Sequence, residues 1–164
     1  DIFDYILIEP NPNCIRELEK LTCEKITLIP KGVWSSETTL NFYGISESDN
    51  KVFLGGSIIS NHNSSRYKSH KKESLKVRTI CLSKLIKDKK QKYDVIIVKM
   101  DIESSEYEVL PKLIKDNSIN LINHLFVEFH SEYFDIKEKS KYMELEKELI
   151  QIIKSKKIGF TNWI

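Results

Sequence analysis

The sequence of 164 residues has few cysteines, few glycines and no long apolar run. Its three cysteines, Cys14, Cys23 and Cys81, are odd in number, and their spacing matches no common metal-binding pattern. They predict reduced thiols in a cytoplasmic protein and argue against a disulfide-rich secreted one. Every apolar run is shorter than the roughly 18 residues that a membrane-spanning helix needs. No membrane partner is therefore expected.

The sequence also lacks a strong charge of either sign. Its net charge is +2, from 26 basic and 24 acidic residues, so the overall charge names no partner. A local basic run lies at residues 66–72, inside the weakly patterned stretch 44–74. Two interpretations of this run stay open: a solvated loop, which we favour, or a surface for a phosphorylated or nucleic-acid substrate. Nucleic acid is an unlikely partner by this argument.

Strand and helix patterns alternate along the chain, which predicts an α/β fold with a mostly parallel sheet in a single domain, residues 1–164. Residues 5–8 and 26–29 are strand-like, and the helix pattern between them, at residues 12–22, completes a parallel βαβ unit. Asn11 is the expected N-cap of this helix, and Pro12 its first residue. Further strands are expected at residues 38–43, 75–80, 95–98, 125–129 and 160–164, and further helices at residues 82–90, 104–115 and 142–156.

The most informative stretch is residues 95–106, where an apolar strand changes abruptly into charged sequence. Residues 95–98 predict a strand covered on both faces, and Lys99, Asp101, Glu103 and Glu106 follow directly. Open α/β sheets bind ligands at the carboxyl ends of their strands, so these side chains are candidates for a site. In an extended chain, the first three would point the same way. The alternative is a serine-capped helix start, in this case at Ser104, with a solvated acidic first turn.

Two other strands are also followed by polar residues. Glu9 follows residues 5–8, and an acid at this place in nucleotide-binding folds accepts hydrogen bonds from ribose hydroxyls. The strand at residues 125–129 ends in Glu128-Phe129-His130, and an acid beside a histidine can form a general-base pair or half of a metal site. Each of these residues also has an ordinary structural interpretation. If the strands are parallel, all three sets lie on one edge of the sheet.

Taken together, these segments resemble the FkbM-type S-adenosylmethionine-dependent methyltransferases. The family pattern at the centre is Lys-Ile-Asp-Val-Glu-Gly-x-Glu, and Ser104 stands here in place of the glycine. The segments that carry the resemblance are Glu9-Pro10-Asn11-Pro12, residues 99–106 and Val127-Glu128-Phe129-His130. Weaker similarity lies in Gly32-Val33-Trp34-Ser35 and in Gly55-Gly56-Ser57.

The resemblance implies a seven-stranded Rossmann-like sheet and methyl transfer to a hydroxyl group of a small molecule, sugar or lipid. S-adenosylmethionine is the implied cofactor, with Glu9 at its ribose. The other implied cofactor-binding residues are Pro10, Asn11, Gly32, Val33 and Asp101.

The resemblance also places Glu103, Glu106, Glu128 and His130 around the reaction pocket. His130 is the first candidate for the base, because the unperturbed pKa of histidine is near neutrality, and Asp101 is the second. A divalent cation is compatible with these carboxylates but is not predicted.

One part of the family pattern is missing. The family opens with a strand and a loop of the form Asp-x-Gly-Ala-x-x-Gly, and neither occurs before residue 9. Because the sequence starts with Asp1 and not with methionine, we expect the natural protein to carry both upstream. The alternative is a reduced, non-catalytic relative that acts as a scaffold through protein contacts. In either case, residues 5–9 should have one strand edge without its usual partner.

Overall fold

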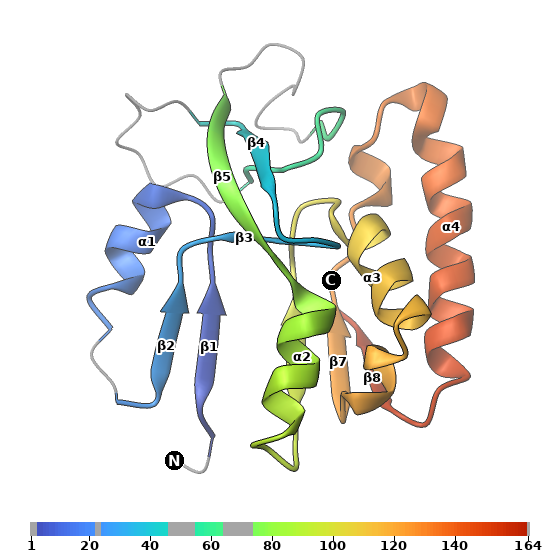
Figure 1. Cartoon of the computed structure of the whole chain (residues 1–164). Helices are drawn as coiled ribbons and strands as arrows, with labels where there is room; N and C mark the ends of the chain where they lie inside the picture. Colours follow the sequence, from blue (N-terminus) through green and yellow to red (C-terminus); the bar gives the residue numbers. More distant parts are fainter. Residues whose placement is uncertain (1–2, 22–23, 46–54, 64–73, 164) are drawn as a thin grey trace.

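A computed structural model describes residues 3–21, 24–45, 55–63 and 74–163 (Figure 1). Strands and helices alternate, which confirms the predicted α/β class. The strands are β1 (Tyr5–Ile8), β2 (Ile26–Ile29), β3 (Gly32–Trp34), β4 (Thr39–Tyr43), β5 (Ser74–Cys81), β6 (Ile97–Met100), β7 (His124–Val127) and β8 (Gly159–Asn162). The helices are α1 (Pro12–Leu18), α2 (Leu82–Lys90), α3 (Glu106–Lys115) and α4 (Ile136–Lys154), with short 3₁₀ helices η2 (Ser118–Leu121) and η3 (Ser131–Tyr133).

The strands form three separate sheets in the described part of the chain. β1 and β2 pair in parallel, and β6, β7 and β8 form a second parallel sheet. In the third sheet, β5 lies between β3, which is parallel to it, and β4, which is antiparallel. Figure 1 shows the β1–β2 pair on one side of α2 and the β7–β8 pair on the other.

Within the described residues, β1 and β6 are not paired with each other, and this gap between the two sheets explains one wrong prediction. Residues 95–98 were expected to be covered on both faces, but Val95 is 52% exposed and Ile97 is 51% exposed. Tyr5, on β1, is 46% exposed. β1 pairs only with β2, and β6 pairs only with β7, within the described residues. Each strand therefore has one unpaired edge, and the expected open edge of β1 is confirmed.

The main hydrophobic core lies between the β6–β7–β8 sheet and helices α2, α3 and α4. Leu125 of β7, Leu110 of α3 and Ile153 of α4 are all fully buried in it. α4 begins at Ile136, before the predicted start at residue 142, because its first turns are mostly charged and carry no apolar period. None of the helices that the structure describes has the length and apolar content needed to cross a membrane.

α1 follows its predicted cap but is shorter than predicted. The side chain of Asn11 accepts a hydrogen bond from the N–H of Asn13 at 2.9 Å, and Pro12 is the first helical residue, as predicted. The helix ends at Leu18, whereas the pattern extended to residue 22. Leu21, within the predicted helix, lies beyond the observed helix end and is 53% exposed.

The core assignment can be tested with one buried and one exposed residue. We expect Leu125→Ala to lower the free energy of unfolding by about 2–5 kcal/mol, because it leaves a cavity beneath β7. Ile136→Ala is the matched control, since Ile136 is 89% exposed. Urea denaturation followed by circular dichroism measures both. Equal losses in the two variants would contradict the assigned core.

Candidate functional site

A cavity of about 260 Å³ lies where the carboxyl ends of β1 and β6 meet β3. The three segments that the sequence singled out for cofactor binding therefore share one cavity wall. Six of the residues named from the sequence line it: Glu9, Pro10, Gly32, Val33, Asp101 and Glu103.

Two glycines let the backbone pack closely against apolar side chains of the cavity wall. A Cβ atom at Gly32 would lie 2.6 Å from Cδ1 of Ile58, and one at Gly56 would lie 2.4 Å from the ring of Phe42. Both distances are shorter than real carbon contacts, so a side chain at either position would displace the wall. All four residues line the cavity.

Glu9 is held in place by the backbone that follows it. Its Oε1 accepts a hydrogen bond from the N–H of Asn11 at 2.7 Å. Burial raises the pKa of Glu9, the hydrogen bond from Asn11 lowers it, and the charge of Asp101 raises it, with a net upward shift. Asn11 itself is only 1% exposed and does not line the cavity. Its side chain caps α1, so its contribution to the site is to orient Glu9.

The chain turns sharply just after β6. The prediction that residues 99–103 are extended is therefore wrong. β6 ends at Met100, and Glu103 and Ser104 have φ angles of 51° and 75°. The Nζ atom of Lys99 lies 3.4 Å from the centroid of the Trp163 ring, and its charge lowers the pKa of Asp101. The left-handed backbone at Ser104 also explains why glycine suits this position in the family pattern.

α3 begins after this turn, without the expected serine cap. Ser105 is the N-cap residue, but its side chain makes no capping hydrogen bond. Instead, Oε1 of Glu106 accepts a hydrogen bond from the N–H of Ile102 at 2.9 Å. Glu106 is completely buried and does not line the cavity. It was expected in the wall of the reaction pocket, but it lies behind that wall.

His130 is the centre of the acidic cluster. Its Nδ1 lies 3.2 Å from Oε1 of Glu106, and its Nε2 lies 3.7 Å from Asp101, 3.6 Å from Glu103 and 3.8 Å from Glu128. The predicted convergence of the β6 and β7 ends is therefore present. The imidazole is 3% exposed, so solvent screens these charges little.

The surrounding carboxylates alter the proton affinity of His130. Burial alone lowers its pKa, but the hydrogen bond and charge of Glu106, together with the charges of Glu103 and Asp101, raise the pKa to about 9. The imidazole is therefore protonated at neutral pH. A pKa near neutrality was the reason for choosing His130 as the base, and that reason does not hold in this structure.

The pKa values of Asp101 and Glu128 are raised as well. Burial raises the pKa of Asp101 and the charge of Glu103 adds to it, whereas His130 and Lys99 act in the other direction. Burial and the charge of Asp101 also raise the pKa of Glu128. Ligand atoms of Asp101, Glu128 and His130 lie within 4.8 Å of one another. Their proximity alone assigns no metal ion to the site.

Two residues of the site were not among the predicted site residues, although Ser57 lies in the segment Gly55-Gly56-Ser57 that carries part of the family resemblance. His62 is completely buried, with Nδ1 2.7 Å from Oγ of Ser104 and Nε2 3.2 Å from Oε2 of Glu103. The hydroxyl of Ser57 donates to the carbonyl oxygen of Glu103 at 2.5 Å. Both lie in residues 55–63, where no strand or helix period marks an inward-facing position. The basic run at residues 66–72 lies outside the described residues.

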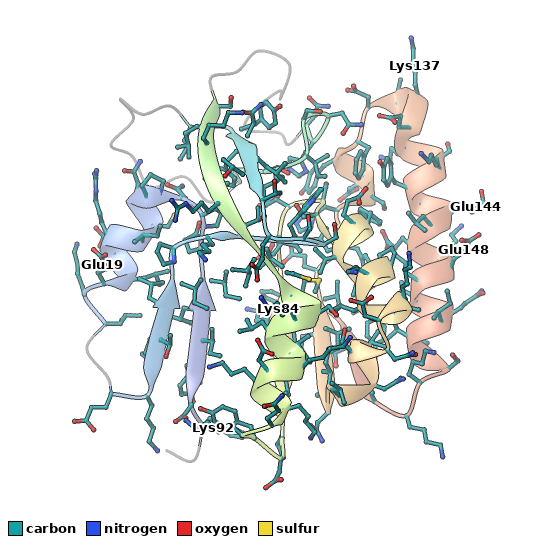
Figure 2. The ribbon with its side chains drawn as sticks, in the orientation of Figure 1. Glu19, Lys84, Lys92, Lys137, Glu144 and Glu148 are labelled. Atoms are coloured by element: carbon teal, nitrogen blue, oxygen red, sulfur yellow. The ribbon has the colours of Figure 1, made fainter. Side chains whose placement is uncertain are left out.

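Several charged residues of α2 and α4 face solvent, unlike the buried centre of the cluster. Figure 2 shows Lys137, Glu144 and Glu148 of α4 pointing away from the ribbon. On α2, the Lys84 side chain is 63% exposed and pairs with Glu37 at 3.1 Å. Exposed pairs of this kind contribute little to stability, about 0–1 kcal/mol.

The raised pKa of His130 predicts how stability depends on pH. The unfolded imidazole titrates near 6.5 and the folded one near 9, so this stabilisation is complete below about pH 6.5 and is lost as pH rises through 9. The unfolding free energy should fall by up to a few kcal/mol, since each pKa unit corresponds to about 1.4 kcal/mol. Urea denaturation at several pH values measures the slope.

The matched variants for this slope are His130→Gln and His124→Gln. His124 begins β7, at the opposite end from the carboxylates, where its Nε2 lies 2.9 Å from Oγ1 of Thr161. His130→Gln should abolish most of the slope, and His124→Gln should retain it. A slope that survives in His130→Gln would contradict the assigned charge of this residue.

Comparison with known proteins identifies the family. The sequence model described as the methyltransferase FkbM domain matches residues 2–160, nearly the whole chain. Neither the comparison with curated proteins nor the comparison with solved structures found a match. The matched region includes the cavity, the turn at Glu103 and Ser104, and the acidic cluster around His130. The chain belongs to the FkbM methyltransferase family, and the protein is a methyltransferase.

Proposed function

We propose that the protein transfers a methyl group from S-adenosylmethionine to a hydroxyl oxygen on a small molecule, sugar or lipid. The observation that carries this proposal is the shared cavity of Glu9, Gly32, Val33, Asp101 and Glu103. The cavity combines an acid after β1, a close backbone approach at β3 and two acids after β6. The ribose diol, the adenine base and the sulfonium centre of S-adenosylmethionine would each meet a chemically complementary group there.

The residues present fit this cofactor in charge and shape. When bound, S-adenosylmethionine supplies a methyl group on a positively charged sulfonium. Glu9 has one carboxylate oxygen engaged by Asn11, which leaves the other to accept from a ribose hydroxyl. Gly32 and Val33 provide a wall without bulky side chains for the adenine, and Asp101 and Glu103 are suitably charged for the cationic end.

Asp101 is the proposed proton acceptor, in place of His130. It lines the cavity, whereas His130 does not, and its raised pKa makes it a better base than an ordinary aspartate. In the reaction, the acceptor oxygen would take the methyl group as the methyl carbon–sulfur bond breaks, S-adenosylhomocysteine would leave, and the hydroxyl proton would pass to the Asp101 carboxylate. Closure of the cavity around the acceptor would exclude water and hold the oxygen in line.

His130 and its neighbours then have a supporting role. The protonated imidazole offsets part of the negative charge of Asp101, Glu103 and Glu128, which lie within 3.8 Å of Nε2. Glu106 holds the other ring nitrogen. This arrangement keeps three carboxylates close together at the end of the parallel strands, where mutual repulsion would otherwise separate them.

We also propose that residues 1–164 form one domain with the Rossmann-like sheet of this family. The unpaired edges of β1 and β6, with Tyr5, Val95 and Ile97 about half exposed, suit one additional parallel strand between them. Such a strand would join the β1–β2 sheet and the β6–β7–β8 sheet into one. The odd number of cysteines, with a spacing that fits no common metal-binding pattern, supports a cytoplasmic location.

The ribose role of Glu9 predicts a loss of cofactor affinity in Glu9→Gln. The amide keeps an oxygen for the N–H of Asn11 but removes one acceptor and the charge, so we expect S-adenosylmethionine to bind about tenfold more weakly or worse. Isothermal titration calorimetry measures the affinity. Glu17→Gln, at an exposed position on α1 that pairs only with Lys20, is the control. Unchanged affinity in Glu9→Gln would rule out this contact.

The base role of Asp101 predicts a different pattern in Asp101→Asn. Transfer of a radiolabelled methyl group to an acceptor that the natural protein methylates should fall by about a hundredfold or more, because the amide cannot take the proton. Cofactor affinity should change much less. His130→Gln should retain more activity than Asp101→Asn, and the reverse order would overturn the assignment of the base.

A further inference from the structure

Residues 55–63 form a strap across the site that is fastened at both ends. At one end, Ser57 exchanges backbone hydrogen bonds with Tyr43 of β4, at 2.8 and 3.1 Å. At the other, the N–H of Asn63 donates to the carbonyl of Tyr133 at 2.6 Å. The middle of the strap contacts the turn after β6 through Ser57 and His62. The strap thus joins the β4 region to η3 by way of the cavity wall.

His62 is the only fully buried side chain of the strap that contacts both residues of the left-handed turn in the described structure. Its Nδ1 lies 2.7 Å from Oγ of Ser104, and its Nε2 lies 3.2 Å from Oε2 of Glu103. The ring also packs on Tyr133, with centroids 5.3 Å apart. One imidazole therefore spans the backbone turn and the carboxylate that the turn presents.

The Ser104 side chain explains how this turn is held without a glycine. Its hydroxyl oxygen lies 2.7 Å from Nδ1 of His62 and 3.3 Å from the carbonyl oxygen of His130. When the hydroxyl donates along the shorter contact, Nδ1 accepts, and Nε2 carries the ring hydrogen that faces Glu103. These two contacts help offset the cost of φ at 75° in a residue with a Cβ. The contact with Ser104 also fixes the orientation of the His62 ring, because it holds Nδ1 while Nε2 faces Glu103.

Glu103 is the only member of this network that lines the cavity. Its carboxylate lies between two rings, 3.2 Å from Nε2 of His62 and 3.6 Å from Nε2 of His130. Its side chain is 19% exposed, and its backbone carbonyl is held by Ser57. A carboxylate at a left-handed turn has rotameric freedom unless its neighbours restrain it. His62 and His130 supply that restraint from two sides.

We propose that His62 is a positioning residue that holds the Glu103 carboxylate against the cavity through Nε2, with Ser104 as the anchor of Nδ1. This role deepens the proposed function, because an oriented Glu103 would face the cationic end of S-adenosylmethionine. The competing explanation is that His62 only fills space and braces Ser104. The two explanations differ in which ring nitrogen matters.

Two amide substitutions separate the ring nitrogens. The side-chain amide of His62→Asn reaches the position of Nδ1 and can keep the contact with Ser104. The longer amide of His62→Gln reaches the position of Nε2 and can keep the contact with Glu103. Glu103→Gln is the reference variant, since it removes the carboxylate charge and leaves His62 in place.

The first readout is the pKa of His130, measured by NMR of the imidazole nitrogens in the full chain without ligand. Glu103, Asp101 and Glu106 all raise this pKa, and Glu128 lies 3.8 Å away. Glu103→Gln should lower it, and His62→Asn should lower it to a similar value because the carboxylate is released. His62→Gln should stay close to the natural protein. An unchanged pKa in His62→Asn, or an equal change in both His62 variants, would overturn the proposal.

The second readout is calorimetric affinity for S-adenosylmethionine. We expect His62→Asn and Glu103→Gln each to weaken binding by about tenfold, because each leaves the cationic end of the cofactor without an oriented carboxylate charge. The double variant should be no weaker than either single one, whereas additive losses would contradict a shared role. If the natural protein binds no S-adenosylmethionine, the proposed function fails, but the His130 titration still tests the role of His62.

Thermal unfolding of each variant checks that it folds. If His62→Asn does not fold, Glu103→Gln provides the test from the other partner. The nitrogen resonance of His62 Nε2 should then shift, while Nδ1, held by Ser104, should change little. Equal shifts at both nitrogens, or no shift at Nε2, would overturn the proposed contact.

Discussion

The buried contact between Glu106 and His130 is the interaction on which the site depends. The two side chains are 0% and 3% exposed, and Oε1 lies 3.2 Å from Nδ1. Taking a carboxylate out of water costs several kcal/mol unless a partner compensates it, so neither residue would be stable there alone. The same oxygen also accepts from the N–H of Ile102. One atom therefore joins the start of α3, the turn after β6 and the segment after β7.

This contact has a chemical consequence beyond stability. With Glu106 on one nitrogen and three carboxylates near the other, His130 carries a positive charge at neutral pH. A histidine in this state organises acids and does not take protons. The cavity wall is then formed by acids, Glu9, Asp101 and Glu103, in surroundings where burial makes at least Glu9 and Asp101 more basic than usual. Such a wall suits a positively charged methyl donor.

The sequence predicted the features that local chemistry controls. Periodicity identified α2 and β2 at their observed bounds, and Asn11 with Pro12 predicted the start of α1. It also identified the three strand ends that carry acids. The sequence-based prediction failed for features that tertiary structure determines. These are the left-handed turn at Glu103 and Ser104 and the half exposure of residues 95–98. His62 escaped prediction because a buried histidine in an aperiodic segment has no local signature. The pKa of His130 depends on residues up to 29 positions away, such as Asp101, and so on the fold.

The central claim is that Glu9, the β3 backbone and Asp101 form one cofactor site. A crystal structure of the protein with S-adenosylhomocysteine, the product of methyl donation, tests this claim most directly. We expect the ribose within hydrogen-bond distance of the Glu9 carboxylate, the adenine beside Gly32 and Val33, and the sulfur next to Asp101. A ligand bound away from this cavity, or with its ribose turned away from Glu9, would contradict the account.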